Sequence, residues 1–226
     1  MTRLEFVSAV QRRLGMRTDL STEILAESVV AQEDLSQIEP IPWFLFRVYS
    51  DTVPTGNEYD LPTDFIKMAF QDRSIFYTDD LDEVLKFRPI EELRAEYLVT
   101  TPARPKYVAY DGFPNGRQRL TFFPPPDVNY VAYFYTYRQD TALNASGTGD
   151  STVNLWLRFA PQLLIWATVA NLAIGTRDEQ LVALAESRKT QLRDYLDRVS
   201  VAKAEEAVER IRREQLPEVF TDDSTN

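Results

Sequence analysis

The segment NLWLRFAPQLLIWATVANLAIG, residues 154–175, decides the predicted fold because it is apolar on nearly all sides. A helix that is hydrophobic all round is typical of a buried position. Pro161 predicts the first turn of this helix, since proline breaks a helix at interior positions, and Gly175 predicts its end. The resulting helix of about 14 residues is shorter than the roughly 20 that a bilayer requires. We therefore predict a core helix and not a membrane span.

A second, charged helix is predicted directly after this core helix. Thr176 and Glu179 match a capping box, and helix-forming sequence continues to Gln215, about 60 Å at the usual rise per residue. The change of apolar face along this helix predicts either two burial partners or a break near Ser200. The first apolar stripe is Leu181, Leu184, Leu192, Tyr195, Leu196 and Val199, and the second is Val201, Ala204, Val208 and Ile211.

Two shorter helices are predicted at the N-terminus. Thr2 and Glu5 match another capping box, apolar residues follow at helical spacing, and Gly15 indicates the end of the first helix. Ser21 is the predicted cap of the second helix, which Pro40 ends. Because the connection between them is short, we expect the two helices to be antiparallel.

The sequence between residues 41 and 140 differs from both ends. It is rich in aromatic and β-branched residues, separated by Pro, Gly, Asn and Asp. Asn115-Gly116 lies between two strand-like runs and predicts a hairpin. Only residues 88–98 read as a helix, with Pro89 in its first turn. We predict a small β domain or sandwich with one short helix.

Together these elements predict an α+β protein. A helical core is built from residues 1–40 and 154–200, residues 41–140 form a β-rich insertion, and residues 201–226 form an extended C-terminal helical arm. The last part of that arm, LPEVFTDDSTN, is polar and acidic apart from Leu216, Val219 and Phe220. Such a segment cannot fold alone, so we interpret it as a docking arm with few apolar anchors.

The composition argues against several classes of function. The chain has 35 acidic and 25 basic residues, a formal net charge of -10, and neither cysteine nor histidine. A net negative field opposes a general nucleic-acid-binding surface. Without cysteine and histidine there are no disulfides, no thiolate chemistry, no Cys/His zinc sites and no imidazole base.

Three short motifs were weighed as sites and interpreted as structural. Ser200–Lys203 matches S-x-x-K but lacks the partner motifs of that enzyme class, so a solvated helix face is preferred. The acidic run DDLDE at residues 79–83 lacks calcium-loop spacing and reads as a solvated turn. Gly147-Thr148-Gly149 lacks the Lys-Ser/Thr of a phosphate loop and reads as a connector. We predict no catalytic residue, no metal and no cofactor.

Three stretches, taken in order, resemble the head-to-tail adaptor (connector) proteins of tailed bacteriophages, chiefly those with short tails. The first is YDLPTDF at residues 59–65. The second is PKY at residues 105–107, followed by RLTFFPPPD at residues 119–127 and a tyrosine-rich strand. The third is VNLWLRFAPQLLIWATVANLA at residues 153–173, followed by the long charged helix. Each alone is a packing or turn pattern, and their order and spacing carry the resemblance.

The resemblance implies a structural virion protein and not an enzyme. It implies a dodecameric ring beneath the portal protein, at the capsid vertex of the virion, assembled in the host cytoplasm. Such a ring extends the channel for genomic DNA, which passes without specific binding, and offers a platform to the next tail or nozzle protein. No membrane is involved. In such families a C-terminal arm commonly grips the portal, so the expected portal or subunit interface is Val201, Ala204, Val208, Ile211, Leu216, Val219 and Phe220.

The aromatic insertion leaves an alternative from another class. Tyr133, Tyr135 and Tyr137 alternate with other residues, which places them on one face of a strand, where their rings could stack on sugars or bases. A half-buried sheet face or a protein interface is the more usual role of such a row. The chain could then be a carbohydrate-binding or glycan-active tail protein, which a glycan-binding screen would reveal. A nucleic-acid-processing partner of the packaging machinery is a third possibility.

Overall fold

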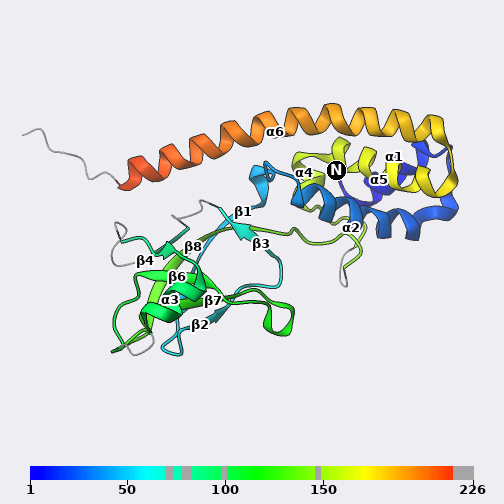
Figure 1. The fold of residues 1–226 in the computed structure, drawn as a ribbon. Coiled ribbons are helices and arrows are strands. Elements are labelled where there is room, and N and C mark those ends of the chain that lie inside the picture. Colours follow the sequence, from blue (N-terminus) through cyan, green and yellow to red (C-terminus); the bar gives the residue numbers. More distant parts are fainter. Residues whose placement is uncertain (70–73, 78–82, 98–100, 146–148, 216–226) are drawn as a thin grey trace, which may run out of the picture. The chain divides into compact units, whose positions relative to one another are not determined.

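The computed structural model describes residues 1–69, 74–77, 83–97, 101–145 and 149–215. It confirms an α+β protein with helices toward both ends and strands in the middle (Figure 1). The chain divides into two compact units. Unit 1 contains Met1–Phe46 and Tyr137–Val201, and unit 2 contains Arg47–Thr136 together with the chain from Ala202 onward.

Unit 1 is helical and is built around α5 (Pro161–Thr176), which packs against α1 (Arg3–Arg13), α2 (Ser21–Gln37) and α4 (Leu155–Phe159). The predicted core helix is confirmed. The side chain of Thr168 in this helix is buried, and its hydroxyl has a hydrogen-bond partner because it donates to the Leu164 carbonyl over 2.8 Å. The buried apolar residues of α5 are Leu163, Leu164, Ile165, Ala167, Val169, Ala170 and Ala173.

Residues just before α5 form a short helix that was not predicted. Asn154 caps α4 by accepting a hydrogen bond from the Leu157 amide over 2.9 Å. The chain then leaves helical geometry at Ala160 and starts again at Pro161. Pro161 is therefore the first residue of α5, as predicted, while the apolar residues before it belong to a separate turn of helix.

The junction between α5 and α6 (Glu179–Gln215) corrects two predictions. Helix α5 continues through Gly175 to Thr176, and Arg177 takes the left-handed conformation with φ of 59°. The Thr176/Glu179 capping box was wrong, because the Thr176 hydroxyl still belongs to α5 and donates to the Ala173 carbonyl over 3.1 Å. Asp178 caps α6 instead, accepting from the Leu181 amide over 3.0 Å.

The N-terminal helices agree with prediction at one cap and differ at the other. Thr2 and Glu5 form the predicted capping box, with the Thr2 amide 2.8 Å from the Glu5 carboxylate. Ser21 does not cap α2; it is the first helical residue, after a 3₁₀ turn at Thr18–Leu20. Its hydroxyl instead accepts from Gln11 and donates to the Thr18 carbonyl, so it joins α1 to the start of α2.

Helix α6 is continuous from Glu179 to Gln215, so the predicted alternative of a break near Ser200 was wrong. Within unit 1 its buried side carries Ala185, Arg193, Leu196 and Ser200. Leu184 and Tyr195, assigned to the first apolar stripe in the sequence, are instead exposed. Residues 11 apart come around to nearly the same angle on a helix, so Leu184 and Tyr195 share one face. That face is not the buried one.

Unit 2 contains two four-stranded sheets. One has the order β1 (Phe46–Val53), β8 (Tyr130–Arg138), β3 (Phe65–Met68), with β4 (Ile75–Tyr77) also pairing antiparallel to β8. The other has the order β2 (Glu58–Asp60), β7 (Arg119–Phe123), β6 (Tyr107–Tyr110), β5 (Lys86–Phe87). Both sheets contribute to one core, which includes Val53, Met68, Ile75, Tyr77, Val108, Leu120, Phe122, Ala132 and Phe134.

The predicted hairpin and helix of the insertion are present with shifted details. Strands β6 and β7 pair antiparallel, and the connection between them includes a 3₁₀ turn at Pro114–Gly116 with Gly116 at φ of 73°. Helix α3 is Ile90–Glu96, and Pro89 is its N-cap and not a first-turn residue. On β8 the tyrosines at 133, 135 and 137 are half-buried on the face opposite the buried Ala132, Phe134 and Thr136, as predicted.

Candidate assembly surfaces

A buried arginine helps to hold helix α6 to unit 1. Arg193 is 7% exposed and donates to the main-chain carbonyls of Leu35 (2.9 Å), Ile38 (2.7 Å) and Pro40 (2.7 Å). Carbonyls in the last turn of a helix have no partner within it, so a guanidinium placed there satisfies them. The side chain thus ties α6 to the C-terminal end of α2 and to the segment that follows.

A carboxylate on the next turn balances the charge of this arginine. Arg193 Nε lies 2.5 Å from the Asp197 carboxylate as an ion pair within α6. Burial lowers the pKa of Arg193 and raises the pKa of Asp197, and the attraction between the two groups opposes both shifts. The charged spacing i, i+4 resembles a solvated helix face in the sequence, which is why the anchoring role of this pair was not predicted.

The anchored part of α6 ends one turn later, immediately before the predicted interface. The Ser200 hydroxyl is buried and accepts from the Trp43 amide over 3.4 Å. Val201, the first predicted interface residue, is 48% exposed. The side chains of Ala204, Val208 and Ile211 lie outside the described residues, although the backbone there is helical. Leu216, Val219 and Phe220 also lie outside them.

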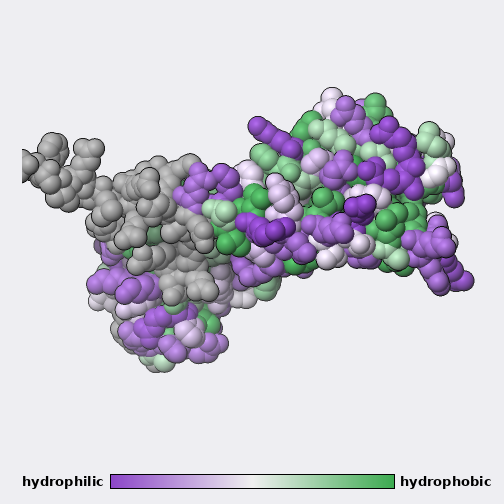
Figure 2. All heavy atoms as spheres, turned by 90° about the horizontal axis from the view of Figure 1, so that it is seen from above, coloured by the Kyte–Doolittle hydropathy of each residue, from purple (hydrophilic) through white to green (hydrophobic). Residues whose placement is uncertain are grey.

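The face of unit 1 that carries α6 has no single large apolar patch (Figure 2). Hydrophobic side chains lie among hydrophilic ones, and the exposed large apolar residues in the described part of α6 are Leu184, Tyr195 and Val201. Small apolar contacts framed by charged residues are typical of interfaces that form between already folded proteins.

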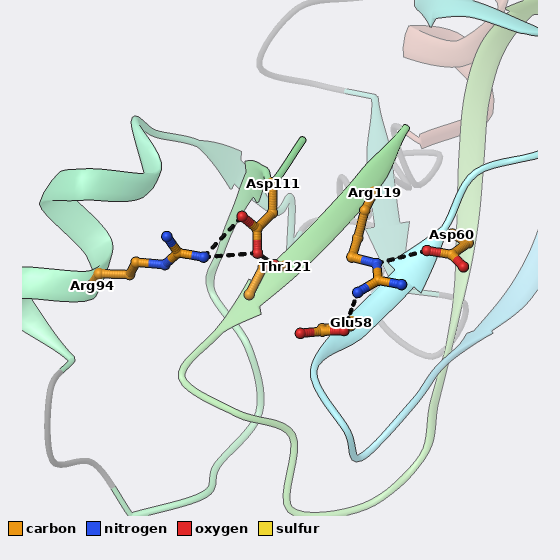
Figure 3. A network of polar contacts seen from close by, with 6 residues as sticks. All are labelled: Glu58, Asp60, Arg94, Asp111, Arg119 and Thr121. Atoms are coloured by element: carbon orange, nitrogen blue, oxygen red, sulfur yellow. Dashed lines mark hydrogen bonds and ion pairs between the residues drawn. The ribbon is translucent and has the colours of Figure 1, made fainter. Parts of the chain in front are cut away.

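Polar contacts on the second sheet of unit 2 hold strands and α3 in place (Figure 3). Arg119 of β7 pairs with both Glu58 and Asp60 of β2, and its hydrogen bond lowers the pKa of Asp60. Asp111 accepts from Arg94 of α3 over 2.8 Å and from Thr121 of β7 over 3.0 Å. Each arginine is thus paired with carboxylates of its own unit, and the network is structural.

Many of the aromatic rings of the insertion pack on one another. Tyr49 and Tyr59 each stack on Phe134, and the buried Tyr77 hydroxyl donates to the Pro105 carbonyl over 2.8 Å. An open cleft of about 800 Å³ in unit 2 is lined in part by Lys67, Met68, Phe87, Arg88, Ile90 and Tyr110, and the tyrosine row of β8 is not among its described lining. Burial raises the pKa of Tyr110 to about 12.

The three motifs weighed in the sequence show no assembled chemistry where the structure describes them. Ser200 contacts the Trp43 amide, while Lys203 pairs with Glu206 over 2.6 Å. Of the acidic run at residues 79–83, only Glu83 is described, and it pairs with Arg104 over 2.9 Å. Residues 147 and 148 lie outside the described part. Among the described residues no group of three or more potential metal-ligating side chains comes together.

Comparison with known proteins gives a family match over most of the chain. A family model described as "SU10 adaptor protein" matches residues 1–215. No curated protein matches the chain. Of the helices in the described residues, none combines the length and the apolar character needed to cross a membrane. The match covers both units, including all of α6.

Proposed function

Because this chain belongs to the SU10 adaptor protein family, a phage family, we propose that it is a head-to-tail adaptor that forms a ring beneath the portal protein. In this proposal the ring extends the DNA channel and provides the platform on which the next tail or nozzle protein assembles. Its place is the neck of the virion, after assembly in the host cytoplasm. The role is structural and requires neither catalysis nor a cofactor, and twelve subunits is the expected number.

The observation that carries this proposal is the length of α6 relative to its buried stripe in unit 1. That stripe ends at Ser200, whereas the same helix continues to Gln215. A helix that continues past the stripe it buries in one unit has further length with which to meet a second partner. Arg193 and Ser200 hold α6 to unit 1 up to the residue before Val201, where the proposed arm begins.

The charge of the chain supports a role as a channel wall. Each lysine or arginine that neutralises a DNA phosphate adds salt-dependent affinity, which would hold the DNA in place. The net charge of -10 disfavours such contacts and suits DNA that slides through without specific binding.

Portal attachment is expected to depend on the C-terminal arm. Removing residues 216–226, or changing both Val219 and Phe220 to Ser, should weaken binding to isolated portal protein roughly tenfold or more, since apolar anchors dominate most interfaces. Binding is measured by co-sedimentation with portal rings, and far-UV circular dichroism checks that the fold is intact. Ser224→Ala with Thr225→Ala is the matched control in the same tail. Full-strength binding by the truncated chain would contradict the assignment of the arm.

A further inference from the structure

Two helices of unit 1 expose faces of opposite charge. In α2 (Ser21–Gln37) there is no lysine or arginine, and its exposed side includes Glu23, Glu33 and Asp34. In α6 the residues on the side of Leu184 and Tyr195 include Arg188 and Arg198, and the nearest exposed acid between positions 184 and 202 is Asp194, at the edge of this side. In a chain with ten more acids than bases, a helix face with more bases than acids is suited to an acidic partner.

Each of these faces has an exposed apolar centre. On α2, Val30 is 44% exposed and lies between the carboxylates, with Ile38 exposed just past the helix end. On α6, Leu184 is 48% and Tyr195 64% exposed. An apolar centre inside a charged rim is the usual anatomy of a protein–protein contact. We refer to these surfaces as the acidic α2 face and the basic α6 face.

The charges on both faces are available within the described residues. Arg188 donates to the Gln191 side chain and Arg198 donates to the Asp194 main-chain carbonyl, so neither is paired with a carboxylate there. Glu23, Glu27, Glu33 and Asp34 have no ion pair in the same part of the chain. The charges of both faces are therefore open to ion pairs with another molecule.

We propose that the acidic α2 face of one subunit docks on the basic α6 face of the next subunit. In Figure 1, α6 runs along one side of unit 1 and α2 along the other, with α5 between them. Two different surfaces on different sides of one subunit make a heterologous contact, which repeats from copy to copy and closes into a ring when the rotation allows. This assignment rests on the proposed ring and names the residues that join its subunits. Like-charged copies would repel at any contact between two identical faces, which favours the alternating arrangement.

The absence of native cysteine allows a direct test by cross-linking. Val30→Cys and Tyr195→Cys are prepared as separate single-cysteine variants, mixed in equal amounts with portal rings, and treated with a short bismaleimide. The mixture is expected to give a covalent dimer, and the double variant is expected to give a ladder of multimers. Neither single variant alone should cross-link. Val128→Cys, an exposed position in unit 2, replaces Val30→Cys in the matched control, which should give only background.

Charge reversal tests the same contact without a cross-linker. Arg188→Glu combined with Arg198→Glu should lower the assembled fraction roughly tenfold or more, because two like-charged faces then oppose each other. Adding Glu27→Arg and Asp34→Arg to the same chain should restore assembly in part. Thermal unfolding of each variant separates lost assembly from lost folding, since all four side chains lie outside the core.

The outcomes separate this contact from the proposed function. Rings that form on the portal without a Val30–Tyr195 cross-link would overturn the α2–α6 contact while leaving the adaptor role intact. A cross-link between two Val30→Cys chains would overturn it as well, since identical faces would then meet. If the unmodified chain forms no ring with or without portal, the proposed function itself fails.

Discussion

The guanidinium of Arg193 makes three hydrogen bonds to main-chain carbonyls and one ion pair, all inside unit 1. No other side chain of α6 is described with so many links to another element of that unit. Arg193 therefore stabilises the packing of α6 through hydrogen bonds that its apolar neighbours on the helix cannot make.

Arg193→Ala is expected to destabilise the protein by about 3–5 kcal/mol. The substitution leaves Asp197 without its buried partner, and no other group replaces the lost charge and hydrogen bonds. Urea unfolding, followed by circular dichroism, measures the change. Arg198→Ala is the matched control on the exposed side of the same helix and should change stability by no more than about 0.5 kcal/mol. Equal losses for the two variants would show that Arg193 is not the anchor.

Among the secondary-structure elements, the start of α6 depends on its N-cap, the residue directly before the helix. Asp178 accepts the hydrogen bond at the third helical residue, while Thr176 completes the last turn of α5. Asp178→Ala should therefore cost about 0.5–2 kcal/mol, the usual effect of losing an N-cap. Thermal unfolding of this variant is compared with that of Thr176→Ala. A larger loss for Thr176→Ala would indicate that the cap of α6 lies at Thr176 after all.

The same junction shows which parts of the fold were readable from the sequence. The capping box at Thr2 and the helix start at Pro161 were predicted because one residue and its near neighbours determine each. At the start of α6, Thr176 and Asp178 are both good caps, and only the point at which α5 ends decides between them. The burial of Arg193 and the exposure of Leu184 and Tyr195 depend on where α2 and α6 meet, which local sequence does not encode.

For the candidate surfaces, the sequence predicted the arm but not the two charged faces. The lack of bases in α2 and the basic side of α6 are visible in the sequence once the helix angle is known. A charged helix face is usually only solvated, so the sequence alone does not mark these faces as contacts. The exposed fractions of the apolar side chains at their centres were also needed. The predicted interface from Val201 to Phe220 stays a prediction.

As a whole molecule, the chain is strongly acidic, and this bears on its handling of DNA. A gel-shift assay with double-stranded DNA at about 150 mM salt is expected to show no complex, either for the free chain or for its rings on portal, because a net negative field repels phosphate. A basic DNA-binding protein serves as positive control. A shift that weakens steeply with salt would instead support a role in nucleic-acid processing.

The unbroken course of α6 also has a mechanical consequence. Between Glu179 and Gln215 there is neither proline nor glycine, the residues at which helices most often kink. A rod without a joint transmits force, so a push or twist on its C-terminal half is carried back to Arg193. From there it reaches the end of α2 through the three carbonyl hydrogen bonds. We therefore expect a displacement of the C-terminal half of α6 to reach α2 chiefly through Arg193.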